Sequence, residues 1–295
     1  MGVSMQKMEA SMEYQHDATL GEGPVWDERE GRLYWVDILS GTLFVYDPVT
    51  NRNKAHDLGE HLGAVGLRRE GGLVVALQSG FAFYDPAERK ITPIADPEAD
   101  RPGNRFNDGK CDPSGRFWAG TMSYELEEGA GSLYCLNRGL EVAVRLRGVT
   151  ISNGMAWDED RFFFIDTPTR QVMAFAYDQE SGTVASPEIL RTVDEGEGYP
   201  DGMTIDREGA LWIALYDGYK VIRIDPVSGE TLFEVHLPVP QVTSCTFGGA
   251  SFRELYITTA REHMSEEEIQ RWPLSGSLFK ASVPFGGSPA ARFGG

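Results

Sequence analysis

Cysteine is scarce in this sequence, and its spacing does not fit its two commonest structural uses. The 295 residues include 3 cysteines, Cys111, Cys135 and Cys245, an odd number with no C-x-x-C pair. A disulfide framework is therefore not expected, and a reducing compartment, the cytoplasm, is the predicted location.

Basic residues are in the minority. Lysine and arginine number 27 against 45 aspartates and glutamates, which gives a net charge of −18. Such a surface repels a phosphate backbone, so nucleic acid is not expected as a partner. The same negative field draws cations toward any cleft that is lined by carboxylates.

Long apolar runs are also missing. No segment approaches the roughly 20 residues needed to cross a bilayer, and the first residues, MGVSMQKMEAS, contain no apolar core of signal-peptide length. We therefore expect no membrane partner. We expect one domain over residues 1–295, of which residues 1–10 form a flexible N-terminal extension.

Sequence motifs of several common enzyme classes do not occur. There is no G-x-S-x-G elbow, no phosphate loop and no dinucleotide fingerprint. The 5 histidines show neither H-x-H nor H-E-x-x-H spacing, so we interpret them as surface or packing residues. A serine hydrolase, a nucleotide-binding enzyme and a histidine-ligated zinc enzyme are thus unsupported.

The sequence instead contains six recurring pairs of short strands rich in aromatic and β-branched residues. The first strands of the pairs begin at Leu33, Leu73, Phe117, Phe162, Leu211 and Leu255. A period of about 44 residues with about four strands per repeat is typical of propeller blades. The prediction is an all-β, six-bladed β-propeller with four antiparallel strands per blade; a β-sandwich with fortuitous spacing is the alternative.

The two ends of the repeat array need separate interpretation. The sixth repeat has no clear fourth strand after Ala281, and the segment from Ser11 (SMEYQ) can supply one, which would close the ring and remove a sheet edge. A capping box, Ser265 with Glu268, predicts a helix in the same repeat. The residues from Pro284 onward read as irregular surface chain.

One short pattern recurs at the start of four inner strands. A carboxylate or carboxamide precedes glycine, and an apolar run then leads to aspartate: LGEGPVWD from Leu20, RFNDGKCD from Arg105, ISNGMAWD from Ile151 and YPDGMTID from Tyr199. Because inner strands line the channel, Glu22, Asn107 or Asp108, Asn153 and Asp201 should meet at one end of it. Oxygen donors of this kind suit Ca²⁺, Mg²⁺ or Mn²⁺, and Zn²⁺ is not excluded.

The alternative interpretation is that these residues only form turns, because Asn-Gly and Asp-Gly are common turn dipeptides. Glu22 is a poor turn former, and the shared register of the four segments favours the metal site. Arg105 should lie beside the same mouth. The turns between second and third strands face this end too, including Tyr124 and Glu125 in the third repeat.

These motifs resemble the gluconolactonase/regucalcin (senescence marker protein) family of six-bladed propellers. The resemblance runs from LGEGPVW to CTFGG at Cys245 and YITTAR at Tyr256. It implies one divalent cation, Ca²⁺ first among the candidates, held by Glu22, Asn153 and Asp201. It also implies substrate contacts from Arg105, Asn107 and Glu125, although the turn SYELEEGAG is shorter than in animal relatives.

The resemblance further implies a reaction. A sugar lactone is the expected small-molecule partner, hydrolysed to an aldonic acid, with Asp201 as general base. Two other functions remain open: a non-enzymatic calcium-binding or regulatory protein, and a paraoxonase-like esterase or phosphotriesterase.

Overall fold

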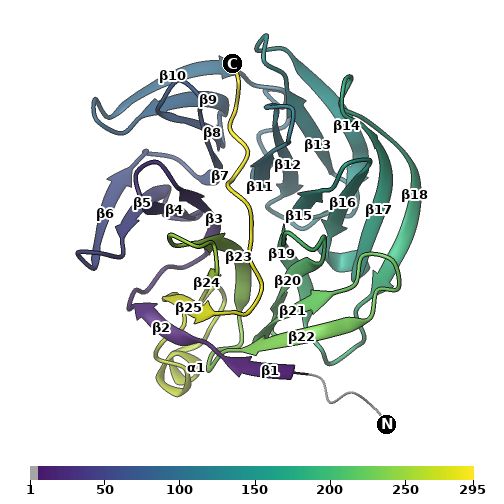
Figure 1. The fold of residues 1–295 in the computed structure, drawn as a ribbon. Coiled ribbons are helices and arrows are strands. Elements are labelled where there is room, and N and C mark those ends of the chain that lie inside the picture. Colours follow the sequence, from purple (N-terminus) through teal and green to yellow (C-terminus); the bar gives the residue numbers. More distant parts are fainter. Residues whose placement is uncertain (1–5) are drawn as a thin grey trace.

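Six β-sheets surround a central channel in the computed structural model, which describes residues 6–295 (Figure 1). Successive inner strands pack against one another around the ring, from β3 to β7 and onward until β23 returns to β3. The six-bladed propeller predicted from the sequence is confirmed.

The blades follow one another along the chain. Blade one contains β3 (Gly21–Asp27), β4 (Arg32–Asp37), β5 (Thr42–Asp47) and β6 (Arg52–Asp57). Blade two contains β7 (Leu62–Leu67), β8 (Leu73–Leu77), β9 (Gly80–Asp85) and β10 (Lys90–Ala95). Blade three contains β11 (Asn104–Cys111), β12 (Phe117–Ser123), β13 (Gly131–Leu136) and β14 (Val142–Val149).

The second half of the ring repeats this winding. Blade four contains β15 (Ser152–Trp157), β16 (Arg161–Asp166), β17 (Gln171–Asp178) and β18 (Thr183–Thr192), with a 3₁₀ turn η1 (Thr167–Thr169). Blade five contains β19 (Tyr199–Ile205), β20 (Leu211–Tyr216), β21 (Lys220–Ile224) and β22 (Thr231–His236). Blade six contains β23 (Val242–Gly248), β24 (Glu254–Thr259) and β25 (Leu278–Ser282).

The N-terminal segment completes two blades. Strand β2 (Ser11–Tyr14) pairs antiparallel with β25 and supplies the missing strand of blade six, as predicted. Strand β1 (Gln6–Glu9) adds to blade five, parallel to β22. Blade five therefore has five strands, and residues 6–9 are not the flexible extension that the sequence predicted over residues 1–10; residues 1–5 lie outside the described part.

The predicted helix is present as α1 (Glu266–Arg271) between β24 and β25. Its capping box forms as expected, because Ser265 Oγ accepts from the Glu268 backbone N–H and the Ser265 N–H donates to Glu268 Oε2 at 2.8 Å. No helix within residues 6–295 has the length and apolar character needed to cross a bilayer.

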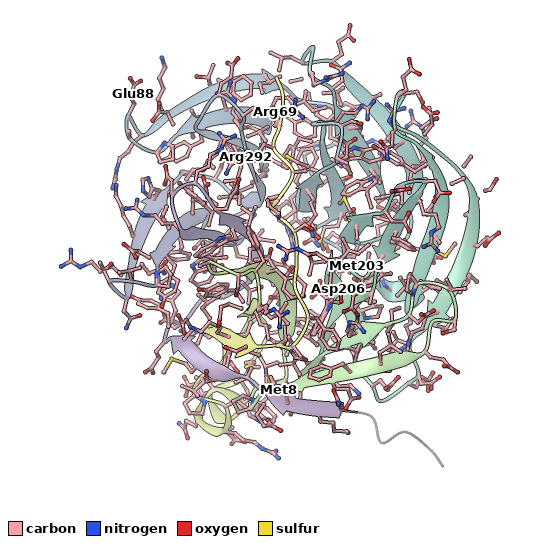
Figure 2. All side chains as sticks on the ribbon, in the orientation of Figure 1. Met8, Arg69, Glu88, Met203, Asp206 and Arg292 are labelled. Carbon is pink, nitrogen blue, oxygen red and sulfur yellow. The ribbon has the colours of Figure 1, made fainter. Side chains whose placement is uncertain are left out.

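The C-terminal segment is not loose surface chain. It crosses the end of the channel where the inner strands terminate, and it forms β-bridges from Gly287 to Asp206 and from Phe293 to Arg68 (Figures 1 and 2). Phe293 is fully buried, and Arg292 pairs with Asp27 at 2.5 Å. The segment is irregular, as expected, but two isolated β-bridges and the buried Phe293 hold it against the ring.

The core lies between neighbouring sheets. Trp35, Trp118 and Trp212 are fully buried, and Trp118 packs against Trp157 of the next blade with ring centroids 5.7 Å apart. Trp212 packs in the same way against Phe247 of blade six, so tryptophans join neighbouring blades.

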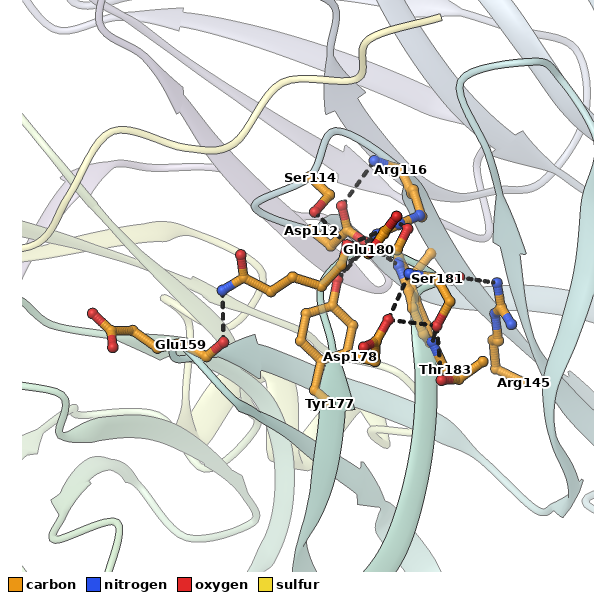
Figure 3. A network of polar contacts seen from close by, with 12 residues as sticks. Asp112, Ser114, Arg116, Arg145, Glu159, Tyr177, Asp178, Glu180, Ser181 and Thr183 are labelled. Atoms are coloured by element: carbon orange, nitrogen blue, oxygen red, sulfur yellow. Dashed lines mark hydrogen bonds and ion pairs between the residues drawn. The ribbon is translucent and has the colours of Figure 1, made fainter.

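The aspartate that ends the recurring pattern is structural in blade three. Asp112 is fully buried and accepts hydrogen bonds from Trp118 Nε1 (2.9 Å), Tyr177 OH (2.7 Å) and Arg116 Nη1 (3.0 Å). Figure 3 shows this network, which ties the end of an inner strand to the neighbouring blade. In blade five, Asp206 accepts from Trp212 Nε1 in the same way.

Candidate metal and substrate site

Every inner strand has a register irregularity near its first residues. Such bulges bend a strand and redirect its side chains. The irregularities lie at 22–25, 62–64, 106–108, 152–155, 200–203 and 242–244. Asn107, Asn153 and Asp201 fall within these irregular stretches, and Glu22 is the last paired residue before one. The sixfold repetition therefore brings the predicted donors to one end of the channel.

The glycines of the pattern are required by packing within the sheet array. Gly154 and Gly202 lie in strands, so the interpretation of Asn-Gly and Asp-Gly as turns is wrong. A Cβ at Gly154 would lie 2.6 Å from Asp201 O, and one at Gly202 would lie 2.1 Å from Ser244 Oγ. Glycine lets each inner strand approach the next at the level of the donors.

Glu22, Asn153 and Asp201 are buried, with 2%, 4% and 6% of their surfaces exposed. The Asn153 amide is oriented, because its Nδ2 donates to Thr167 Oγ1 at 3.0 Å and that hydroxyl donates to Pro200 O at 2.9 Å. Within the described residues, Asn153 Oδ1 and Asp201 Oδ1 are buried and have no hydrogen-bond partner. Two oxygen acceptors are thus left free at the same end of the channel.

The charges at this end repel one another. Burial, followed by the charge of Asp108, raises the pKa of Glu22 to about 8. Burial and then the charges of Glu22 and Asp108 raise the pKa of Asp201 well above its usual range. Burial likewise raises the pKa of Asp108. A bound cation would relieve this repulsion and satisfy the free oxygens.

The donor set fits a hard divalent cation. No group of three or more His, Cys, Asp or Glu side chains within residues 6–295 is arranged to hold a metal. The candidate set is instead two carboxylates and one carboxamide oxygen, which are ligand types of Ca²⁺ and Mg²⁺. The orphaned Asn153 and Asp201 oxygens support this fit.

Arg105 and Asn107 form a joined pair beside these donors. Arg105 is 5% exposed; its Nη1 donates to Asn107 Oδ1 at 2.8 Å and to Phe106 O at 3.1 Å. Asn107 Nδ2 donates to Ser152 O of blade four at 2.9 Å. Both ends of the Asn107 amide are thus engaged in hydrogen bonds within the protein.

Glu125 lies apart from the buried group. It follows Tyr124 on the turn after β12, its side chain is exposed, and its backbone N–H donates to Ser123 Oγ at 3.1 Å. Any contact with a ligand would therefore come from the rim of the mouth.

Lys110 was not singled out from the sequence. Burial lowers the pKa of this amine, the Asp108 and Glu22 carboxylates raise it, and its Nζ donates to Met203 O at 2.5 Å. Asp108 and Lys110 are two residues apart on β11 and share a face, which was the available signal. Both line a cavity of about 540 Å³ that extends to Ser288 and Ala291 of the C-terminal segment.

Known proteins are similar to this chain in sequence and in fold. A family model described as the SMP-30/gluconolactonase/LRE-like region matches residues 20–261. The protein named "Putative sugar lactone lactonase YvrE" from Bacillus subtilis (strain 168) is 40% identical over 290 residues, which is 98% of this chain and 99% of that protein. Regucalcin from Xenopus laevis is 41% identical over 268 residues, 88% of this chain and 90% of that protein.

A solved structure shows the same similarity in the fold. The crystal structure described as a calcium-binding protein, regucalcin, from Agrobacterium tumefaciens str. C58 superposes with a TM-score of 0.94 at 28% identity and covers 99% of each chain. The family resemblance expected from the sequence motifs is thereby confirmed. With a matching model over most of its length and relatives at this identity, the chain belongs to the SMP-30/gluconolactonase/LRE-like family.

Proposed function

We propose that this protein is a divalent-metal-dependent lactonase that hydrolyses sugar lactones to aldonic acids. The observation that supports this most directly is the pair of unpartnered buried oxygens, Asn153 Oδ1 and Asp201 Oδ1, at the channel end where Glu22 also lies. The name of the Bacillus subtilis relative, a sugar lactone lactonase, supports the substrate class.

Glu22, Asn153 and Asp201 would hold the cation, with Ca²⁺ as the first candidate and Mg²⁺, Mn²⁺ or Zn²⁺ as alternatives. When bound, the cation would supply Lewis-acid polarisation of the lactone carbonyl. Regucalcin relatives, one of them described as calcium-binding, support Ca²⁺.

The chain's own residues would carry out the remaining steps. Asp201 would act as general base and accept a proton from the attacking water. The water oxygen bonds to the carbonyl carbon, the ring C–O bond breaks, and the ring oxygen takes up a proton to become a hydroxyl of the product. Arg105, whose Nε and Nη2 make no hydrogen bond within residues 6–295, would bind substrate oxygens, with Asn107 holding it and Glu125 at the rim.

The test begins with protein stripped by a chelator and assayed with a panel of sugar lactones, an unsubstituted aliphatic lactone and an aryl ester. Adding back Ca²⁺, Mg²⁺, Mn²⁺ or Zn²⁺ should restore turnover of the sugar lactones and raise the thermal midpoint. Cation binding without turnover would instead support a regulatory calcium-binding protein, and preference for the aryl ester would support a paraoxonase-like esterase.

Asp201→Ala should abolish hydrolysis while leaving the propeller folded. Glu159→Gln is a matched control, because this substitution also removes one negative charge. Glu159 is exposed and lies beyond the far end of β15. Full activity in Asp201→Ala would remove Asp201 from the mechanism.

A further inference from the structure

One hydrogen bond crosses the seam between blades two and three at the mouth of the candidate site. His61 Nδ1 and the Tyr124 hydroxyl are 2.6 Å apart, and the two ring centroids are separated by 5.6 Å. His61 precedes β7, and Tyr124 follows β12. Both positions belong to the channel end where the inner strands begin.

Both residues are fixed by their backbones. His61 O accepts from the Gln78 N–H at 2.9 Å, and the Tyr124 N–H donates to Gly103 O at 2.9 Å. The neighbouring Glu60 carboxylate accepts from the Ser79 N–H at 2.7 Å and from its hydroxyl at 2.8 Å. The bond therefore joins two anchored turns and does not depend on a mobile segment.

Strand register places Tyr124 beside Arg105. Arg105 pairs with Met122 and Asn104 with Ser123, and the bond from Tyr124 to Gly103 continues the β11–β12 ladder by one residue. Tyr124 and Arg105 are thus diagonal neighbours on one face, within reach of an aromatic and a long side chain. Gly103, opposite Tyr124, leaves open space at this point, since a Cβ there would meet nothing within 4 Å.

The charge of Arg105 reaches both partners. Burial and then Arg105 lower the pKa of His61. Burial raises the pKa of Tyr124, and Arg105 opposes that rise. The charge of the guanidinium thus acts on both rings, in keeping with the strand register, and Tyr124 is 37% exposed, so that it can contact a ligand.

We propose that the His61–Tyr124 pair is a specificity-determining wall of the substrate site. The inference deepens the proposed lactonase function and rests on it. The hydrogen bond holds the Tyr124 ring beside Arg105, so that the hydroxyalkyl substituent of a sugar lactone is bound between the ring and the guanidinium. Without the bond the ring is free to turn toward solvent, and the site loses its preference for substituted lactones.

A double-mutant cycle tests this wall. Tyr124→Phe, His61→Ala and the double variant are assayed with a six-carbon sugar lactone and with an unsubstituted aliphatic lactone. Each single change should lower the preference for the sugar lactone about fivefold, mainly through KM, as expected for one ordinary hydrogen bond. The double variant should be no worse than either single one, because both remove the same bond.

Tyr46→Phe is the matched control. Its hydroxyl donates at 2.9 Å to Glu13 of β2 in blade six, and Tyr46 lies at the end of β5 in blade one that points away from the β4–β5 turn and the site. Its loss should leave the lactone preference unchanged. Thermal midpoints of all variants confirm folding, and the imidazole ¹⁵N shifts of His61 should change in Tyr124→Phe, which reports the bond independently of turnover.

The outcomes separate the two proposals. Wild-type protein that hydrolyses no lactone with any cation would overturn the proposed function and, with it, the proposed wall, which rests on that function. Active wild-type protein whose lactone preference is unchanged in both single variants, or whose two effects add, would overturn the wall alone.

Discussion

Arg105 Nη1 donates a hydrogen bond to Asn107 Oδ1 at 2.8 Å, and Asn107 is in turn bonded to Ser152 O of the next blade. The side chains of Arg105 and Asn107, which were expected to contact substrate separately, are therefore coupled by a hydrogen bond. The amide fixes the guanidinium, and the neighbouring blade fixes the amide. This relationship determines how substitutions at the two positions combine.

Asn107→Ala should raise KM for the preferred sugar lactone about tenfold, because it releases a buried guanidinium from its fixed position. Arg105→Ala should also act mainly on KM. The double variant should be little worse than Arg105→Ala, which steady-state kinetics of the three proteins will show. Asn137→Ala, on an exposed turn of the same blade, is the control, and additive effects at 105 and 107 would contradict the coupling.

Gly202→Ala should destabilise the fold by about 1–3 kcal/mol, as overpacking of a tight interior does. The added Cβ would meet Ser244 Oγ at 2.1 Å and Ser244 Cβ at 2.5 Å. Denaturant unfolding gives the free energy directly. Ser244→Gly in the same chain should restore part of the loss, whereas Gly103→Ala, which meets no atom within 4 Å, should change little.

Glu234 should give blade five a stability term that depends on pH. Its burial raises the pKa of this carboxyl, but hydrogen bonds from Lys220, Lys7 and His236 outweigh burial and lower the pKa to about 2. The stabilisation is therefore present above the unfolded-state pKa near 4.5 and is lost as the pH falls toward 2.

Glu234→Gln should consequently cost about 2 kcal/mol at neutral pH and progressively less below pH 4. Urea unfolding of both proteins from pH 7 to pH 3 measures the difference. A cost that stays constant over this range would show that the ion pairs with Lys7 and Lys220 do not stabilise the blade.

Phe293→Ala should lower the free energy of unfolding by about 3–5 kcal/mol, the usual cost of emptying a buried phenylalanine site. Phe293 is fully buried and its backbone bonds to Leu67 and Arg69. Val227→Ala, at a side chain that is 81% exposed, should have almost no effect. A small loss in Phe293→Ala would mean that the C-terminal segment only rests on the ring.

Sequence periodicity was sufficient for the ring, its closure by the segment from Ser11 and the capped helix after Ser265. The ring follows from a repeat and the helix from residues close together in the sequence, whereas the closure was inferred from the fourth strand that the sixth repeat lacks after Ala281. The pairing of β1 with β22 was not predictable in this way, because residues 6–9 are short, polar and bonded through backbone atoms to a strand more than two hundred residues away.

The candidate site likewise has features that the sequence predicted and features that it did not. Glu22, Asn153 and Asp201 were identified because one chemical type recurs at one position of the repeat, and the structure brings them to the same end of the channel. The bond between Arg105 and Asn107 depends on rotamers, and the exposed place of Glu125 depends on the conformation of a turn. Lys110 occupies a position of the apolar run that follows the glycine, outside the donor position, and was overlooked for that reason.

Closure of the ring by β2 has a consequence for biosynthesis. Ser11 and Lys280, which meet in blade six, are 269 positions apart, so the Ser11 segment is synthesised long before the strand with which it pairs. Five blades can assemble while both open edges of the nascent ring are still unpaired. Non-local pairing of this kind is slow, and unpaired strand edges favour aggregation. The moment of greatest risk for this protein is therefore the interval before blade six is translated, when holdase chaperones would protect it most.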